Sequence, residues 1–287
     1  MEQPSHCANP KLGPRIWQVS RILIVAYLAA GIGCAALQRR MIYHPRIIAS
    51  DDSDRLAASV GLERWRDFTG QNIGWKRLSQ MPQVQGIVLI THGNAGCAID
   101  RSDYAKAMQE SAAMDVFILE YPGFGDRAGS PSERNLFKAA DEGFAALPTN
   151  GPVYLVGESL GTGVAAYLAG SHPTNVAGVL LVAPYRILTE VAQYHVRIFP
   201  VRWLLQDRFQ SEDYLRPYRG PIAMLLAGKD RVVPAKFGRR LFDSYAGPKR
   251  LWEFPDANHE TIHQQPPEFW NAVAKFWQTN EALPNSR

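Results

Sequence analysis

The sequence predicts a doubly wound α/β fold with a mostly parallel sheet, and two observations lead to this prediction. Short apolar runs recur along the body of the chain, and segments with helical patterning separate them. The runs are continuous rather than alternating, which is typical of strands covered on both faces. Alternating strands and helices of this kind form a parallel sheet, and ligands then bind near the carboxyl ends of its strands.

The elements follow in chain order. Parallel strands are expected at Gly86–Thr91, Asp115–Glu120, Pro152–Val156, Gly178–Ala183 and Ile222–Ala227, and a further strand at Arg250–Phe254. Helices are expected at 100–112, 131–147, 160–170, 234–246 and 267–279. Residues 63–78 predict one or two antiparallel edge strands. The stretch 186–220 is too long for a simple connection and predicts a short helical cap.

One helix start has a strong sequence signature. Ser130 is expected to be the N-cap of the second helix, with Pro131 at the first helical position and Glu133 three residues after the cap.

The basic residues are concentrated at the N-terminus. Of the net charge of +4, residues 1–46 carry +5 and the remainder −1. A near-neutral body with a basic leader argues against a nucleic-acid-binding domain. The three cysteines are too few for a disulfide framework and lack metal-site spacing.

An apolar segment near the N-terminus predicts a membrane anchor. Ile22–Leu37 contains no charge and no proline, and as a helix it spans roughly 24 Å at ~1.5 Å per residue. We expect a basic tail at 1–21, an anchor or signal-anchor helix at 22–38, and one catalytic domain at 39–287. Charge at both ends of the run and apolar character on every face favour this over a buried core helix.

Two other fates of this segment stay open, as does its orientation. Gly31–Ala36 supplies small residues that suit a cleaved signal peptide, and Cys34 fits a lipoprotein signal poorly. Basic residues are balanced on the two sides of the run, so they determine orientation weakly. We take an extracytoplasmic catalytic domain as the working expectation. The sequence does not indicate an oligomeric state.

A Gly-x-Ser-x-Gly motif identifies the candidate nucleophile. Gly157–Gly161 (GESLG) directly follows an expected strand and opens an expected helix, which is the context that a nucleophile elbow requires. The turn forces Ser159 into a strained conformation, and the flanking glycines allow it. The residues 161–166 (GTGVAA) also match a dinucleotide fingerprint. That motif needs an acidic residue about 20 positions later, and none occurs between Ser159 and Glu190.

A second glycine-rich loop predicts the oxyanion hole. His92–Gly96 (HGNAG) follows the strand at 86–91 and precedes the elbow in the chain. Backbone N–H groups in such a loop can point at a developing oxyanion. We expect the N–H of Asn94 to be one donor, with Gly93 as the alternative, and the N–H of Leu160 to be the other. His92 is expected to be architectural.

Chain order selects the acid and the base. Asp230 follows the strand at 222–227, and His259 lies in the loop after the strand at 250–254. The order Ser, Asp, His is that of a hydrolase with a nucleophile elbow. Asp256 is the alternative acid, and His263, one helical turn beyond His259, is the alternative base.

Five segments together resemble the α/β-hydrolase-domain serine hydrolases, in particular their membrane-anchored branch with a short cap. These segments are LITHGNAG, EYPGFGDRAGSPSE, LVGESLGTGVAA, LLAGKDRVVP and FPDANHE, and the resemblance covers about residues 40–280. It implies an esterase, lipase or thioesterase that acts on small-molecule or lipid acyl substrates without a cofactor. Asn258 stands where glycine is frequent. Glu158 in the elbow and the lack of an HGGG loop leave the substrate class open.

Two other functions remain compatible with these residues. A serine peptidase can use the same Ser, His and Asp on the same scaffold, and the fold also hosts non-catalytic binding proteins.

Overall fold

A computed structural model describes residues 12–280 in two compact units, which divide after Gln38. In the first unit the helix α1 (Leu12–Ile42) begins, and it extends beyond both ends of the predicted segment 22–38. From Ile16 to Met41 its large apolar side chains are exposed, unlike those of a core helix. Within residues 12–280 it is the one helix long and apolar enough to cross a membrane.

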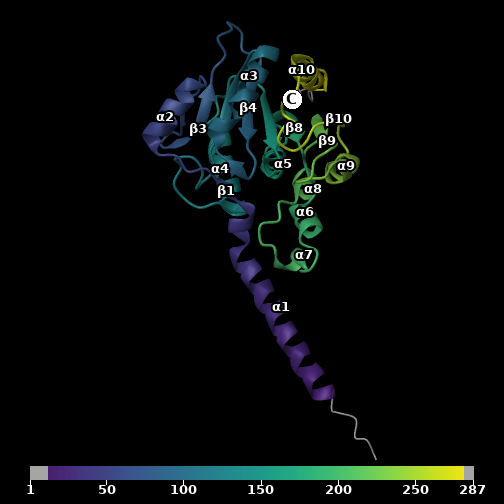
Figure 1. Ribbon diagram of the computed structural model, residues 1–287. Helices are drawn as coiled ribbons and strands as arrows, with labels where there is room; N and C mark the ends of the chain where they lie inside the picture. The colour runs from purple at the N-terminus through teal and green to yellow at the C-terminus, as the bar shows by residue number, and fades with distance from the viewer. Residues whose placement is uncertain (1–11, 281–287) are drawn as a thin grey trace, which may run out of the picture. The chain divides into compact units, whose positions relative to one another are not determined.

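The second unit is built on an eight-stranded sheet with the order β10-β9-β8-β7-β4-β6-β3-β2 (Figure 1). Six strands are parallel, and β3 and β2 are antiparallel at one edge, as predicted for 63–78. The strands are β2 (Glu63–Arg66), β3 (Asn72–Arg77), β4 (Gly86–Thr91), β6 (Met114–Leu119), β7 (Val153–Glu158), β8 (Val176–Val182), β9 (Ile222–Ala227) and β10 (Lys249–Phe254).

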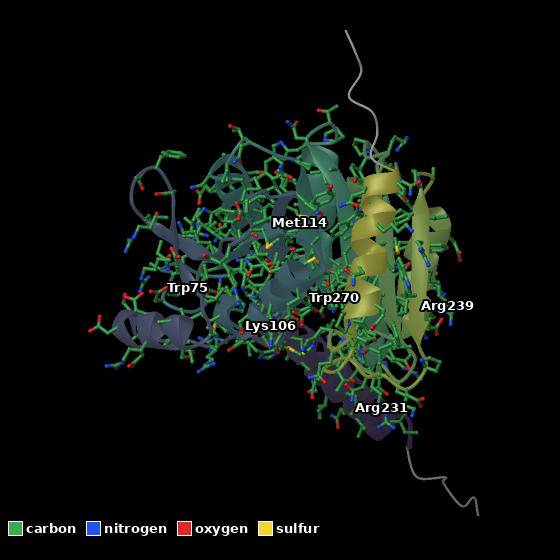
Figure 2. The ribbon with its side chains drawn as sticks, turned by 90° about the horizontal axis from the view of Figure 1, so that it is seen from above. Trp75, Lys106, Met114, Arg231, Arg239 and Trp270 are labelled. Carbon is green, nitrogen blue, oxygen red and sulfur yellow. The ribbon has the colours of Figure 1, made fainter. Side chains whose placement is uncertain are left out.

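Helices cover both faces of the sheet and complete two apolar cores. Side chains alternate along β4, so that Ile87 and Leu89 enter one core and Val88 and Ile90 the other. The first core is closed by α4 (Glu133–Ala145), α5 (Gly161–Ser171) and α9 (Ala235–Ser244). The second is closed by α3 (Ser102–Ser111) and α10 (Pro267–Asn280) and contains Trp75, Met114 and Trp270, labelled in Figure 2.

The stretch 186–220 forms three short helices between β8 and β9, in agreement with the predicted helical cap. They are α6 (Leu188–His195), α7 (Val201–Leu204) and α8 (Ser211–Tyr214). Two further short elements complete the second unit. They are the 3-10 helix η1 (Ala98–Arg101) and a two-stranded parallel sheet of β1 (His44–Pro45) and β5 (Ala95–Gly96). The helix α2 (Ser50–Ser59) follows β1.

The predicted cap of α4 is wrong by two residues. The N-cap is Ser132, whose hydroxyl accepts a hydrogen bond from the N–H of Asn135, and not Ser130. Glu133 is therefore the first helical residue. Its carboxylate accepts hydrogen bonds from the N–H groups of Arg208 and Phe209, both at 2.8 Å, instead of closing a capping box.

Both edges of the sheet carry charged side chains. The edge strand β2 has the sequence ERWR, and β10 at the opposite edge begins with Lys249 and Arg250. Glu253 of β10 forms an ion pair with Arg239 at 2.5 Å. Ion-paired and charged edge strands of this kind are poor templates for a further strand.

Candidate functional site

Ser159 lies at the sharp turn between β7 and α5, where the sequence predicted a nucleophile. Its φ angle of 50° is in the left-handed region, which is rare for a residue with a side chain. The flanking glycines are required by close packing. A Cβ atom at Gly157 would lie 2.7 Å from the carbonyl oxygen of Gly161, and one at Gly161 would overlap the carbonyl oxygen of Thr91. The turn therefore holds Ser159 strained and displayed at the end of the strand.

His259 lies between Ser159 and Asp230 and contacts both. Its Nε2 atom is 3.0 Å from Oγ of Ser159, and its Nδ1 atom is 2.7 Å from Oδ2 of Asp230. The other carboxylate oxygen of Asp230 accepts the N–H groups of Val232 and Val233 at 2.8 and 2.7 Å. The backbone therefore fixes the buried Asp230, and Asp230 in turn can fix the imidazole ring.

The alternative acid and base lie elsewhere. The side chain of Asp256 is exposed and pairs with Nζ of Lys229 at 2.6 Å, and this hydrogen bond and charge lower the pKa of Asp256. The ring of His263 stacks on Tyr104 with 5.5 Å between the ring centroids. Neither side chain has a hydrogen bond to Ser159 or His259 among the contacts of residues 12–280.

The loop predicted to hold the oxyanion donors lies against Ser159. A Cβ atom at Gly93 would be 3.5 Å from Cβ of Ser159, an ordinary van der Waals distance, so the loop and the turn are in direct contact. In the described part of the chain, the backbone N–H groups of Asn94 and Leu160 donate to no protein acceptor. The side chain of Asn94 has a different task, since its Nδ2 donates to the carbonyl oxygen of Ile42 at 2.6 Å.

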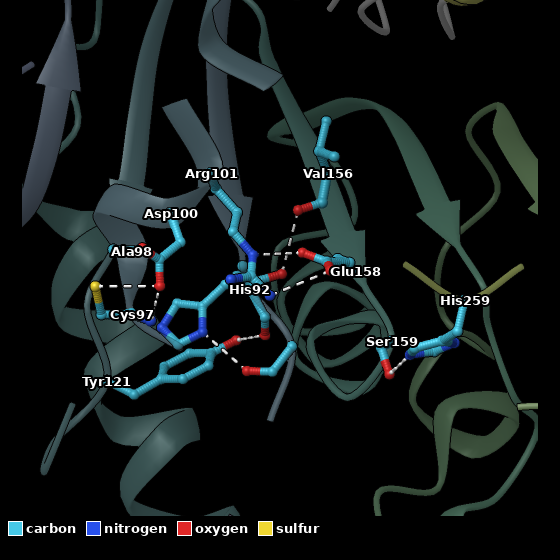
Figure 3. A network of polar contacts seen from close by, with 12 residues as sticks. His92, Cys97, Ala98, Asp100, Arg101, Tyr121, Val156, Glu158, Ser159 and His259 are labelled. Atoms are coloured by element: carbon cyan, nitrogen blue, oxygen red, sulfur yellow. Dashed lines mark hydrogen bonds and ion pairs between the residues drawn. The ribbon is translucent and has the colours of Figure 1, made fainter. Parts of the chain in front are cut away.

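An ion pair that the sequence did not predict joins the end of η1, which follows the loop of Asn94, to the turn at Ser159. Nε and Nη2 of Arg101 lie 2.6 and 3.2 Å from the carboxylate oxygens of Glu158, the residue before Ser159 (Figure 3). Burial lowers the pKa of Arg101, but the charge of Glu158 and its hydrogen bond more than offset this and raise it. The signal in the sequence was Glu158 itself, because a charged residue inside a buried turn needs a partner of opposite charge.

His92 is enclosed behind this loop. It is fully buried, its Nδ1 lies 2.8 Å from the carbonyl oxygen of Gly93, and its ring packs on Tyr121 at 4.1 Å between centroids. The hydroxyl of Tyr121 donates to the carbonyl oxygen of His92 at 2.9 Å. The Nε2 atom of His92 lies 3.4 Å from the carboxylate of Glu120, and that carboxylate accepts the N–H of Ala98. These contacts give His92 a structural role.

The glycines after the elbow serve packing with the cap. A Cβ atom at Gly163 would lie 2.9 Å from Cβ of Phe209 and from the hydroxyl of Tyr185. That hydroxyl donates to the carbonyl oxygen of Leu160 at 3.1 Å. The small residues thus let cap side chains approach the elbow, which explains the fingerprint-like pattern at 161–166 without a nucleotide. Within residues 12–280 no three His, Cys, Asp or Glu side chains gather as metal ligands would.

Comparison with known proteins places the chain in a family. The family profile described as alpha/beta hydrolase fold matches residues 86–211. The uncharacterized protein Rv2307c of Mycobacterium tuberculosis is 32% identical over an alignment of 251 residues, which covers 83% of this chain and 86% of that protein. The chain belongs to the α/β-hydrolase superfamily.

Other relatives of this α/β-hydrolase carry the names of lipases and esterases. Lysophosphatidylserine lipase ABHD12 of Macaca fascicularis is 31% identical over 207 residues, covering 65% of this chain but 51% of that longer protein. The esterase Pf2001 of Pyrococcus furiosus has the same fold, with a TM-score of 0.60 and 16% identity over 83% of this chain and 99% of its own. The lipase relatives and the apolar helix support a hydrolase with a membrane anchor, whereas the esterase structure shows the fold alone.

Proposed function

We propose that the protein is a membrane-anchored serine hydrolase that cleaves acyl esters or thioesters. The observation that carries the proposal is the continuous line of contacts from Asp230 through His259 to Ser159, at a strained turn between strand and helix. A serine at such a turn, with an imidazole within reach and a buried carboxylate behind it, is the arrangement that activates a hydroxyl as a nucleophile.

The mechanism assigns one task to each group. His259 takes the proton of Ser159 as the hydroxyl attacks the acyl carbonyl, and Asp230 orients the ring and stabilises its cationic form. The N–H groups of Asn94 and Leu160 bind the oxyanion of the tetrahedral intermediate. His259 then gives its proton to the leaving alcohol or thiol. Water, activated by His259, hydrolyses the acyl-enzyme and restores Ser159.

A lipid or an acylated protein is the proposed source of the acyl group. Relatives of the chain are named as lysophosphatidylserine lipases, and an apolar helix would keep the enzyme beside lipid. The cap also exposes a large apolar side chain, Trp203, which is 71% accessible. Trp side chains are favoured at membrane interfaces. A substrate with one acyl chain and a polar head group would suit both the named lipase relatives and a location at a membrane surface.

A fluorophosphonate probe tests the nucleophile. The intact protein should be labelled, labelling should vanish in Ser159→Ala, and it should fall sharply in His259→Ala and Asp230→Asn. His263→Ala is the matched control for the base and should label normally. Failure to label the folded wild type would overturn the proposal and favour a binding protein on this fold.

A substrate panel then tests the leaving group. We expect turnover of p-nitrophenyl esters, acyl thioesters and lysophospholipids, and no turnover of peptide amides with equivalent acyl groups. Cleavage of the amides at a comparable kcat/KM would instead identify a serine peptidase.

The catalytic domain is proposed to lie on the extracytoplasmic side. Phe68 is 87% exposed, whereas the native Cys97 is buried, so a Phe68→Cys variant supplies an accessible thiol in the second unit. In a background without Cys7 and Cys34, a membrane-impermeant maleimide added to intact cells should label this variant. Labelling that requires cell lysis would place the domain in the cytoplasm.

A further inference from the structure

The segment that leaves the anchor is built into the candidate site. Arg39–Ile48, here called the strap, connects the apolar run to α2 and belongs to the second unit. On one side it contacts the loop of Asn94, the proposed oxyanion donor. On the other side it contacts Asp207 in the segment between α7 and α8, here called the return loop of the cap. Nothing in the reaction chemistry requires such a segment, so its contacts call for a separate explanation.

The strap holds Asn94 at two points. The N–H of His44 donates to the carbonyl oxygen of Asn94 at 2.8 Å, and the side chain of Asn94 donates to the carbonyl oxygen of Ile42 at 2.6 Å. One step further, the N–H of Arg46 donates to the carbonyl oxygen of Gly96 at 2.8 Å. Since the carbonyl and the side chain of Asn94 are both held, the position of its backbone nitrogen is constrained as well.

The strap also supplies the partners of a buried carboxylate in the cap. The hydroxyl of Tyr43 donates to Asp207 at 3.0 Å, and Nε of Arg39 lies 3.1 Å from the same oxygen. Tyr43 and Asp207 are both nearly inaccessible to solvent. In the described part of the chain, no other side chain forms a hydrogen bond with this carboxylate. Without the strap, Asp207 would be a buried charge lacking a partner, which is strongly unfavourable.

Asp207 lies close in the chain to residues that reach the elbow. Two positions later, Phe209 packs on Gly163 near the start of α5, and its N–H is held by Glu133 at 2.8 Å. Burial, followed by the charge and hydrogen bond of Asp207, raises the pKa of Tyr43 far above its ordinary value. The hydroxyl of Tyr43 therefore stays a donor over the whole working range of pH.

We propose that the strap is a positioning element of the active site, with Tyr43 and Asp207 as its positioning residues. The inference rests on the proposed function. By fixing the loop of Asn94 and the return loop of the cap together, the strap makes turnover depend on the chain that leaves the anchor. Release of the domain by a cut within Arg39–Ile48 would then inactivate it, although Ser159, His259 and Asp230 would all be retained.

Three variants of the full chain test this inference. Tyr43→Phe and Asp207→Asn remove or weaken the cap contact, and Asn94→Ala removes the side-chain tether while keeping the backbone N–H. Each should lower kcat for a soluble p-nitrophenyl ester by roughly tenfold to a hundredfold, the scale expected for a small misplacement of a catalytic group. KM should change little. The double variant Tyr43→Phe/Asp207→Asn should lose no more than the more affected single variant.

Tyr167→Phe is the matched control, because it deletes a hydroxyl that donates to Asp141 at 2.8 Å outside the strap. It should leave kcat unchanged. Assays are run well below each variant's Tm, and affinity for a boronic acid, which forms a tetrahedral adduct with the serine, should fall in parallel with kcat. Loss of stability alone would not produce that parallel.

The outcomes separate the two proposals. An inert wild type that resists the fluorophosphonate would overturn the proposed function. An active wild type whose strap variants keep full kcat and boronic acid affinity at that temperature would overturn the positioning role alone.

Discussion

The guanidinium of Arg101 forms two hydrogen bonds with the carboxylate of Glu158, at 2.6 and 3.2 Å, and both side chains are largely buried. Arg101 ends η1, which follows the loop of Asn94, and Glu158 immediately precedes Ser159. Two parallel N–H···O bonds constrain direction as well as distance. The pair therefore links the loop of the proposed oxyanion donor to the turn of the proposed nucleophile.

A double-mutant cycle on this pair should show strong coupling. Arg101→Lys keeps the charge but loses the planar fork, and Glu158→Gln keeps the shape but loses the charge. We expect a coupling free energy of ~1–3 kcal/mol in denaturant unfolding, because the two groups are in direct contact. Exposed pairs such as Lys106 and Glu110 should show almost none. Additive losses for Arg101 and Glu158 would contradict the linkage.

The choice between two acids can be tested by matched substitutions. Asp230→Asn should lower kcat by about 10⁴-fold with little change in fold, since the amide would hold the ring of His259 in the wrong tautomer. Asp256→Asn should have almost no effect, because Asp256 is exposed and pairs with Lys229. Steady-state kinetics on a soluble ester measures both. The reverse order of effects would reassign the acid.

The elbow should not tolerate a methyl group. In Gly161→Ala the new Cβ would overlap the carbonyl oxygen of Thr91, so the turn would have to shift and we expect a loss of several kcal/mol of stability, measured as a fall in Tm. Gly151→Ala is the control. Its Cβ would meet the nearest backbone atom, Cα of Gly86, at an ordinary distance of 3.6 Å. Equal Tm values for the two variants would refute this account of the turn.

Cys97 should be unreactive in the folded protein. Burial, and then the nearby charge of Glu120, raises the pKa of its thiol to about 12, so the thiolate is scarce at neutral pH. Iodoacetamide should leave Cys97 unmodified and esterase activity intact, as followed by mass spectrometry of the native protein. Modification should appear only after unfolding. Rapid native labelling of Cys97 would show that this loop opens.

The sequence predicted the central parallel strands well because each is a largely apolar run between turn residues. It also nominated Ser159, Asp230 and His259, since strand ends and chain order constrain where such side chains can meet. Asp256 remained an alternative acid because distance along the chain does not reveal which carboxylate reaches the imidazole. The structure distinguishes them by burial and by hydrogen-bond partner.

Residues that act through long-range contacts had no local signal. Tyr43 and Asp207 are 164 positions apart, and each alone resembles an ordinary surface polar residue in the sequence. The prediction of the N-cap of α4 failed for a related reason. The local pattern indicated Ser130, but the distant N–H groups of Arg208 and Phe209 engage Glu133, the residue expected to complete the box at Ser130.

The charged edge strands β2 and β10 have a consequence for the proposed membrane-anchored enzyme. A bilayer raises the effective concentration of anchored proteins, and open sheet edges are where neighbouring copies could join strand to strand. Glu63 and Arg64 at one edge, and Lys249 and Arg250 at the other, would have to lose water for such a joint to form. Crowding at the membrane surface can therefore increase without the catalytic domains polymerising through their sheets.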